Sequence, residues 1–256
     1  MPTRKLTLKN YVAGRGQPIL FLHGVYMGPE MWRSVTEKLT DAQVILADMP
    51  GHGQSPGIMD TTLEDHIEMV RAIIEELGLQ KPLLVGHSWG GMVGLRLAVK
   101  HPSLLGGLVL TNTPLRRTAG MGRFGFHIQQ LMLLFGFSAR SYGRIAAGAL
   151  IGKEYLEGNQ QEIVACGERL AKMGRSQVRA TIRSVLLEPE DGLPLLDKLD
   201  IPWAASAGKD DYVIQNGVAE TITAKTELFI GKGAHATPLE DPDTMLKAIN
   251  TVRDRL

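Results

Sequence analysis

The chain has 256 residues, of which 44% are hydrophobic and 21% are charged, and its net charge is +1 at pH 7. This length suits one large α/β domain with an insertion, and the composition is ordinary for a globular protein. Because the charges nearly balance, they give no reason to expect nucleic-acid binding. The single cysteine, Cys166, excludes an intrachain disulfide and a cysteine-based metal cluster.

Targeting signals are not evident in the sequence. The first eight residues offer no apolar core of a signal peptide. The longest apolar stretches, such as residues 131–137, are shorter than the roughly 20 residues that cross a bilayer. We therefore expect a cytoplasmic protein without a membrane-spanning segment.

Apolar runs and turn residues predict the elements of the first half of the chain. Two strands at residues 5–12 and 18–22 flank a glycine-rich turn and are expected to form a hairpin. The predicted elements that follow are a short helix at 31–39, a strand at 44–47, a loop at 48–53, a helix at 61–78, a strand at 82–85, a helix at 92–99 and a strand at 107–110. Apolar strands that alternate with amphipathic helices are typical of a parallel sheet with helices on both faces.

This alternation stops after Thr113. Residues 114–195 are mostly helical in character, and a buried strand returns at 203–206. We therefore predict an α/β core with a mostly parallel central sheet, made of residues 1–113 and 196–256, and a helical cap at residues 114–195 inserted after the sixth strand. An insertion at the carboxyl end of a strand lies over the crevice in which α/β proteins bind ligands, so the cap is expected to act as a lid.

The hexapeptide Gly86-His87-Ser88-Trp89-Gly90-Gly91 lies between the apolar run at 82–85 and a helix-compatible run. A G-x-S-x-G sequence in this context is typical of a sharp turn that exposes a nucleophilic serine. Small residues are needed in such a turn because the backbone of the strand and that of the helix approach each other closely. Ser88 is therefore the predicted nucleophile.

A serine hydroxyl needs a base that takes its proton and a group that orients the base. A last strand is predicted at residues 226–230. Among the seven histidines, His235 follows this strand, so its loop is expected at the same edge of the sheet as Ser88. The strand at 203–206 leads to two candidate carboxylates, Asp210 and Asp211. Asp211 is preferred because the spacing Gly208-x-x-Asp211 puts it past the turn, and Asp210 is the alternative.

An oxyanion that develops during acyl transfer needs preorganised donors. The N–H of Trp89 follows the nucleophile at the start of a helix, where free N–H groups and the helix dipole favour negative charge. The N–H of Val25 follows His23-Gly24 at the end of another predicted strand. These two backbone groups are the predicted oxyanion hole.

Together these segments resemble the α/β-hydrolase superfamily over essentially the whole chain. The resemblance rests on Leu22-His23-Gly24-Val25, Asp48-x-Pro50-Gly51-His52-Gly53-x-Ser55, Gly86-His87-Ser88-Trp89-Gly90-Gly91, Gly208-x-x-Asp211 and His235. The cap resembles the branch with esterases, enol-lactonases, carbon–carbon bond hydrolases, dehalogenases and epoxide hydrolases. The last two groups place aspartate where this chain has Ser88, and Ala234 stands where the family often has glycine.

The residues and the resemblance imply a serine hydrolase, without a cofactor or a metal, that cleaves a carboxylic ester or lactone of a small, partly apolar substrate through an acyl-enzyme. Three alternatives stay open: carbon–carbon bond hydrolysis of a ketone or diketone, transfer of the acyl group to a nucleophile other than water, and a ligand-binding homologue with little turnover. The predicted pocket residues are Tyr26, Met27, Phe126, Met132 and Tyr212. A small-molecule substrate is the expected partner, and the sequence does not define the oligomeric state.

The predicted cap holds 11 Lys and Arg against 7 Asp and Glu, which gives it a net charge of +4. Arg175, Arg179 and Arg183 recur every four residues and would form one stripe on a helix. A solvated helix face is the favoured interpretation of this stripe. Guidance of a carboxylate-bearing substrate is the alternative.

Overall fold

The computed structural model describes residues 9–57 and 59–256. Over these residues it forms one sheet with the strand order β1-β3-β2-β4-β5-β6-β7. β1 pairs antiparallel with β3, and the other neighbouring pairs are parallel. The strands are β1 (Asn10–Ala13), β2 (Gln17–Leu22), β3 (Ala42–Ala47), β4 (Leu83–His87), β5 (Gly107–Thr111), β6 (Trp203–Gly208) and β7 (Leu228–Gly231). The prediction of a mostly parallel central sheet is confirmed.

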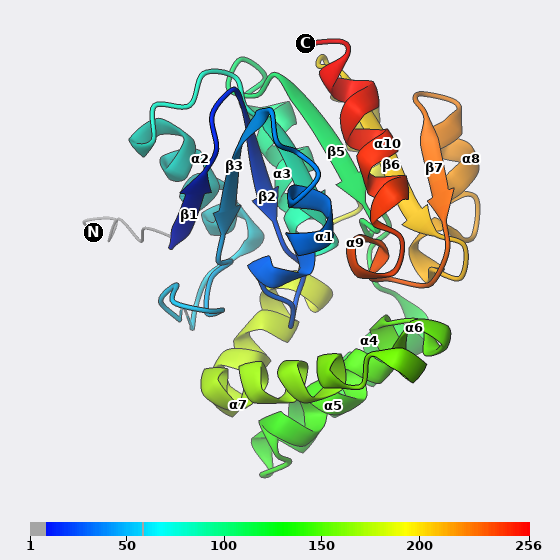
Figure 1. Ribbon diagram of the computed structural model, residues 1–256. Coiled ribbons are helices and arrows are strands. Elements are labelled where there is room, and N and C mark those ends of the chain that lie inside the picture. Colours follow the sequence, from blue (N-terminus) through cyan, green and yellow to red (C-terminus); the bar gives the residue numbers. More distant parts are fainter. Residues whose placement is uncertain (1–8, 58) are drawn as a thin grey trace.

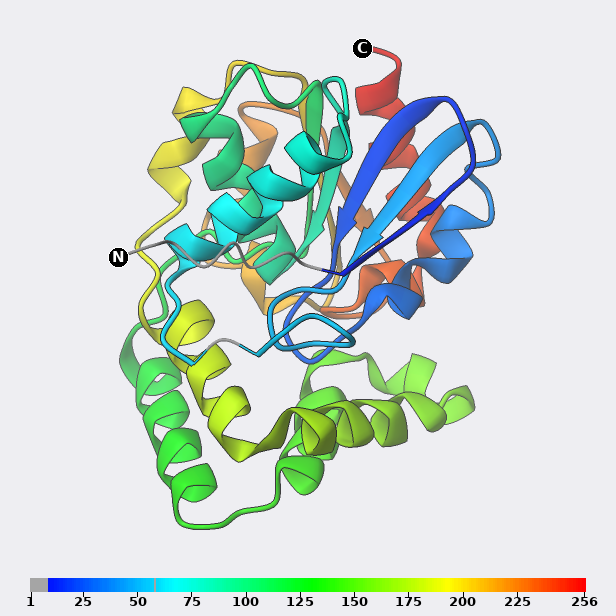
Figure 2. The ribbon, with the colours of Figure 1, turned by 90° about the vertical axis from the view of Figure 1, so that its left-hand side faces the viewer.

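Helices cover both faces of this sheet, as predicted. Figure 2 shows α2 (Leu63–Glu76) and α3 (Trp89–Lys100) on one side and α1 (Arg33–Thr36) and α10 (Pro242–Arg253) on the other. The short helix α9 (Thr237–Glu240) packs beside α10, and α8 (Val218–Thr223) lies against β7. α2 begins at a capping box in which Thr62 and Asp65 satisfy each other's backbone N–H groups.

The predicted hairpin between the first two strands is wrong. β3 lies between β1 and β2 and pairs with both. The connecting segment crosses the start of β3, and a Cβ on Gly14 would lie 2.4 Å from the carbonyl oxygen of Ala42. The positive φ angles of Gly14 and Gly16 serve this close backbone crossing, which turn chemistry alone does not distinguish from a hairpin. Residues 5–8 of the first predicted strand lie outside the described residues.

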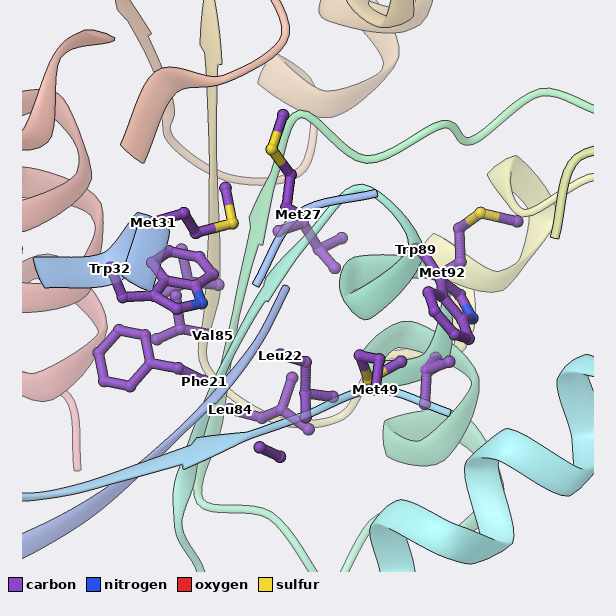
Figure 3. Close-up of a cluster of buried hydrophobic side chains, with 14 of the residues drawn as sticks. Phe21, Leu22, Met27, Met31, Trp32, Met49, Leu84, Val85, Trp89 and Met92 are labelled. Atoms are coloured by element: carbon purple, nitrogen blue, oxygen red, sulfur yellow. The ribbon is translucent and has the colours of Figure 1, made fainter. Parts of the chain in front are cut away.

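The central strands supply the core of the molecule. All residues of β4 and β5 and the last four of β2 are buried, as expected for parallel strands covered on both faces. Figure 3 shows side chains of β2 and β4 packed among buried aromatic and methionine side chains, and the ring of Phe21 lies 5.1 Å from that of Trp32. This packing fixes the carboxyl ends of β2 and β4, after which Gly24 and Ser88 follow.

A helical insert, called the cap below, lies between β5 and β6 (Figure 1). It consists of α4 (Gly120–Leu134), α5 (Ala139–Leu150), α6 (Lys153–Gly158), α7 (Gln161–Thr181), a π-helical segment (Ile182–Leu187) and a 3₁₀ segment (Leu193–Lys198). Figures 1 and 2 both place α4–α7 beyond one end of the sheet. The prediction that the cap follows the sixth strand is wrong: five described strands precede it, and the sixth, β6, returns to the position next to β5. Among residues 9–57 and 59–256, the helices are too short or too polar to span a bilayer.

Candidate active site

Ser88 lies on the sharp turn between β4 and α3. Its backbone has φ 51° and ψ −110°, a strained conformation for a residue other than glycine. A Cβ on Gly86 would lie 2.5 Å from the backbone of Gly90, and a Cβ on Gly90 would lie 2.2 Å from the carbonyl oxygen of Leu22. The structure thus explains why both flanking positions hold glycine.

The three residues predicted as a triad lie together at the carboxyl ends of β4, β6 and β7. His235 Nε2 lies 2.9 Å from Ser88 Oγ, and His235 Nδ1 lies 3.0 Å from Asp211 Oδ1. All three side chains are buried, with exposed fractions of 5% or less. Asp210, the alternative acid, is exposed. This geometry allows a histidine to take a proton from serine while a carboxylate fixes the imidazole.

Asn112, directly after β5, contacts Asp211 through its amide nitrogen. Its Nδ2 donates to Asp211 Oδ2 (2.6 Å) and to the carbonyl oxygen of Ala234 (3.1 Å). Burial acts to raise the pKa of Asp211, but the His235 imidazole and hydrogen bonds from His235, Asn112 and the Val213 N–H hold that pKa below its usual value. No motif in the sequence contains Asn112, and the available signal was a polar residue at the carboxyl end of a strand.

The backbone after β2 passes directly beside Ser88. A Cβ on Gly24 would lie 2.5 Å from His87 Nδ1 and 3.1 Å from Ser88 Cβ. Within the described part of the chain, neither the Val25 N–H nor the Trp89 N–H donates to a protein acceptor. Trp89 also begins α3, so its N–H lies at a helix N-terminus. The residue before Val25 and the first residue of α3 thus lie beside the serine.

The other motif histidines bind backbone groups rather than Ser88. His23 Nε2 accepts from the Met49 N–H (3.0 Å), and His52 Nε2 accepts from the Tyr26 N–H (3.1 Å). His87 Nε2 donates to the carbonyl oxygen of His235 (2.6 Å) and so holds the loop of the proposed base. Burial lowers the pKa of His52 to about 4 and that of His87 to about 3, which keeps both imidazoles neutral near pH 7.

The predicted pocket residues lie in different places. Phe126 and Tyr212 line a cavity of about 430 Å³ that also contacts Met92, and the Tyr212 ring stacks on His235 at 5.3 Å. Tyr26 and Met27 are buried where the cap meets the core. Met132 is 41% exposed on α4 and does not line that cavity.

The arginine stripe lies apart from the triad. α7 is kinked at Gly174 (φ +77°), so Arg175, Arg179 and Arg183 do not continue the helix that precedes them. Arg183 pairs with Asp60, and Arg179 exchanges hydrogen bonds with Gln130. In residues 9–57 and 59–256, no group of three or more His, Cys, Asp or Glu side chains is placed to hold a metal ion.

Comparison with known proteins agrees with this architecture. The model of the alpha/beta hydrolase fold family matches residues 17–148. A pimeloyl-[acyl-carrier protein] methyl ester esterase of Edwardsiella ictaluri is 27% identical over 251 residues, which are 93% of this chain and 94% of that protein. The crystal structure of the enol-lactonase from Burkholderia xenovorans LB400 is similar with a TM-score of 0.86 and 16% identity, over 96% of each chain.

A shorter match has higher identity. An (E)-2-((N-methylformamido)methylene)succinate hydrolase of Acinetobacter baylyi is 33% identical over 114 residues, which are 44% of this chain and 43% of that protein. This chain therefore matches less than half the length of that relative. Since the family model covers more than half of the sequence and the fold agrees with it, the chain belongs to the α/β hydrolase fold family.

Proposed function

We propose that the protein is a serine hydrolase that cleaves a carboxylic ester or lactone of a small, partly apolar substrate. The observation that carries the proposal is the hydrogen-bonded relay from Asp211 through His235 to Ser88. Ser88 Oγ attacks the carbonyl carbon while His235 Nε2 takes the serine proton and then gives it to the leaving alcohol oxygen. Water, deprotonated by His235, hydrolyses the resulting acyl-enzyme and frees Ser88.

The N–H groups of Val25 and Trp89 stabilise the oxyanion of both tetrahedral intermediates in this proposal. Two observations support this role of the N–H groups: the close approach of Gly24 to Ser88 and the position of Trp89 at the N-terminus of α3. In comparable enzymes the loss of one such donor lowers kcat by about 10²- to 10³-fold.

The apolar part of the substrate occupies the 430 Å³ cavity beside Tyr212. This volume lies within the roughly 300–1,000 Å³ of small-molecule sites. Tyr212 lines the cavity and its ring also stacks on His235, so this one side chain connects the cavity with the proposed base. The ester and lactone substrates in the names of the esterase and the enol-lactonase support a substrate of the same chemical class.

Intact-mass spectrometry after exposure to a fluorophosphonate tests the nucleophile. We expect one adduct per chain, no adduct on Ser88→Ala, and much slower labelling of His235→Ala. Ser103→Ala, which changes an exposed serine, is the control and is expected to label normally. A folded native protein that stays unlabelled, or a Ser88→Ala variant that labels like the native chain, would contradict the proposal.

Turnover assays then test the reaction. Short-chain nitrophenyl esters and small lactones are expected to be hydrolysed in a Ser88-dependent manner. Cleavage of a vinylogous diketone substrate with no turnover of esters or lactones would instead assign carbon–carbon bond hydrolysis to the same residues.

A further inference from the structure

Tyr26, which follows the proposed oxyanion donor Val25, has a backbone φ of +66°. This left-handed conformation is uncommon for a bulky residue. A hydrogen bond from the Met27 N–H to the Gly24 carbonyl oxygen (3.3 Å) closes a turn with Val25 and Tyr26 at its centre. The Gly24 carbonyl oxygen, which also accepts from His23 Nδ1 (2.8 Å), belongs to the same peptide group as the Val25 N–H, so this turn helps to fix the direction of that donor. The turn in its present form depends on contacts that keep Tyr26 in the left-handed conformation.

Several of these contacts come from the cap. The carbonyl oxygen of Tyr26 accepts hydrogen bonds from Arg169 Nη1 (2.9 Å) and from the more distant Cys166 Sγ (3.5 Å), both on α7. The Tyr26 hydroxyl lies 3.1 Å from the hydroxyl of Tyr142, on α5. The core supplies a partner for the Tyr26 N–H, which donates to His52 Nε2 (3.1 Å).

Arg169 makes the charged contact among them, and its side chain is 18% exposed. While Nη1 donates to Tyr26, Nε donates to Glu30 Oε1 in the core (2.7 Å). A guanidinium is planar and carries five N–H donors in fixed directions, so one side chain can fix a carbonyl oxygen and a carboxylate together. Arg169 thus connects the cap with two core residues five positions or fewer from Val25.

We propose that Arg169 is a positioning residue for the oxyanion hole: by fixing the Tyr26 carbonyl, it keeps the Val25 N–H directed at the oxyanion. This inference rests on the proposed function. Without the guanidinium, Tyr26 can relax to a negative φ, which breaks the hydrogen bond from the Met27 N–H to the Gly24 carbonyl oxygen. That carbonyl oxygen and the Val25 N–H belong to the same planar peptide group, so its loss of a partner lets the donor turn away from the oxyanion. The cap then contributes to catalysis through the backbone of the core as well as by covering the substrate.

The test compares Arg169→Met with Glu30→Gln. Arg169→Met keeps an unbranched side chain but removes every donor. Glu30→Gln removes the ion pair, while its amide oxygen can still accept from Arg169 and the bond to Tyr26 stays. Rates are expressed per active site, counted by fluorophosphonate labelling, so that misfolded molecules do not enter them. Binding of a trifluoromethyl ketone, whose adduct with Ser88 carries an oxyanion, reports on the oxyanion hole directly.

Arg169→Met is expected to lower kcat for an ester by about 10- to 100-fold, with KM within about twofold of the native value. Affinity for the ketone should fall by a similar factor. Glu30→Gln should stay within about twofold in both assays. A kcat of Arg169→Met equal to that of the native enzyme, or equal losses in the two variants, would overturn the proposal.

Arg169→Lys covers the case in which Arg169→Met does not fold. In the double variant Arg169→Lys with Glu30→Gln, the ammonium group no longer has a carboxylate partner and can donate to the Tyr26 carbonyl oxygen. The double variant should therefore have a higher kcat than Arg169→Lys alone. No such recovery would also overturn the proposal. Full ester hydrolysis by Ser88→Ala would instead refute the proposed function, whereas a Ser88-dependent reaction that is insensitive to Arg169 refutes this inference alone.

Discussion

The imidazole of His235 is fixed by more than its carboxylate partner. Asn112 binds Asp211 and the Ala234 carbonyl oxygen, and its own amide oxygen accepts a hydrogen bond from Thr111 Oγ1 (2.8 Å). Its φ of +48° lies in the left-handed region that asparagine tolerates better than most residues. One amide thus connects the proposed acid with the loop of the proposed base.

Asn112→Gly is expected to lower kcat/KM by about 10- to 100-fold, because a hydrogen bond to a charged group contributes about 1.5–3 kcal/mol. Glycine tolerates the positive φ, so the change removes the side chain without backbone strain. Steady-state kinetics, with circular dichroism to check folding, measures the effect. Thr111→Val, which removes only the bond that orients the amide, should cause a smaller loss. An unchanged kcat/KM in a folded Asn112→Gly variant would exclude this role.

Local sequence patterns predicted the residues that lie in turns with unusual backbone angles. Ser88 and its flanking glycines were predictable because the strained turn requires small neighbours, and the strand order along the chain placed Asp211 and His235 at the same edge. Asn112 was missed because its partners are about 100 residues away in the sequence. The hairpin was predicted wrongly for a related reason: glycines permit a turn, but the strand that pairs with β1 is chosen by distant contacts.

Glu240, on α9, joins the loop of His235 to the cap. Its carboxylate accepts hydrogen bonds from the N–H groups of Ala234 (2.9 Å), Ala236 (3.0 Å) and Gly152 (3.0 Å). The first two flank His235, and Gly152 precedes α6 of the cap. The His235 N–H also donates to the carbonyl oxygen of Leu150 in the cap (3.0 Å). Glu240 on this short helix therefore holds both the loop of His235 and the residue that precedes α6.

Glu240→Gln is expected to destabilise the protein by about 2 kcal/mol, because one of the two accepting carboxylate oxygens is replaced by an NH₂ group, which cannot accept a hydrogen bond from a backbone N–H. Urea unfolding followed by circular dichroism measures the change. Glu220→Gln, at an exposed position on α8, is the matched control and should change stability by less than about 0.5 kcal/mol. Equal stability of the two variants would show that the carboxylate contributes nothing at this junction.

At the scale of the whole molecule, four histidines in residues 9–57 and 59–256 are buried and have lowered pKa values. Burial lowers the pKa of His52 and His66 to about 4 and that of His87 to about 3, and it also lowers the pKa of His23. Their partners fit neutral rings: His66 Nδ1, for example, accepts from Trp89 Nε1 at 3.3 Å. The motifs around His23 and His52 thus position the backbone near the active site without carrying charge.

This arrangement predicts how stability depends on pH. A group whose pKa is lower in the folded state than in the unfolded state contributes stability that is present above the unfolded pKa, here 6.5, and is lost as the pH falls towards the folded value. Between pH 6.5 and about 4, unfolding should therefore take up protons. Each histidine that is neutral only in the folded state should make the free energy of unfolding fall by about 1.4 kcal/mol per pH unit.

Urea unfolding at a series of pH values from 7.5 to 5 would measure this slope. His66→Gln is the diagnostic variant, because the amide oxygen can accept from Trp89 but does not titrate in this range. Unfolding of this variant should take up about one proton fewer, so its free energy of unfolding should fall less steeply with decreasing pH. His127→Gln changes an exposed histidine and serves as the control, with an unchanged slope. A free energy of unfolding that stays constant between pH 7 and pH 5 would contradict the neutral state of the buried rings, because their charging in the unfolded chain is what favours unfolding in acid.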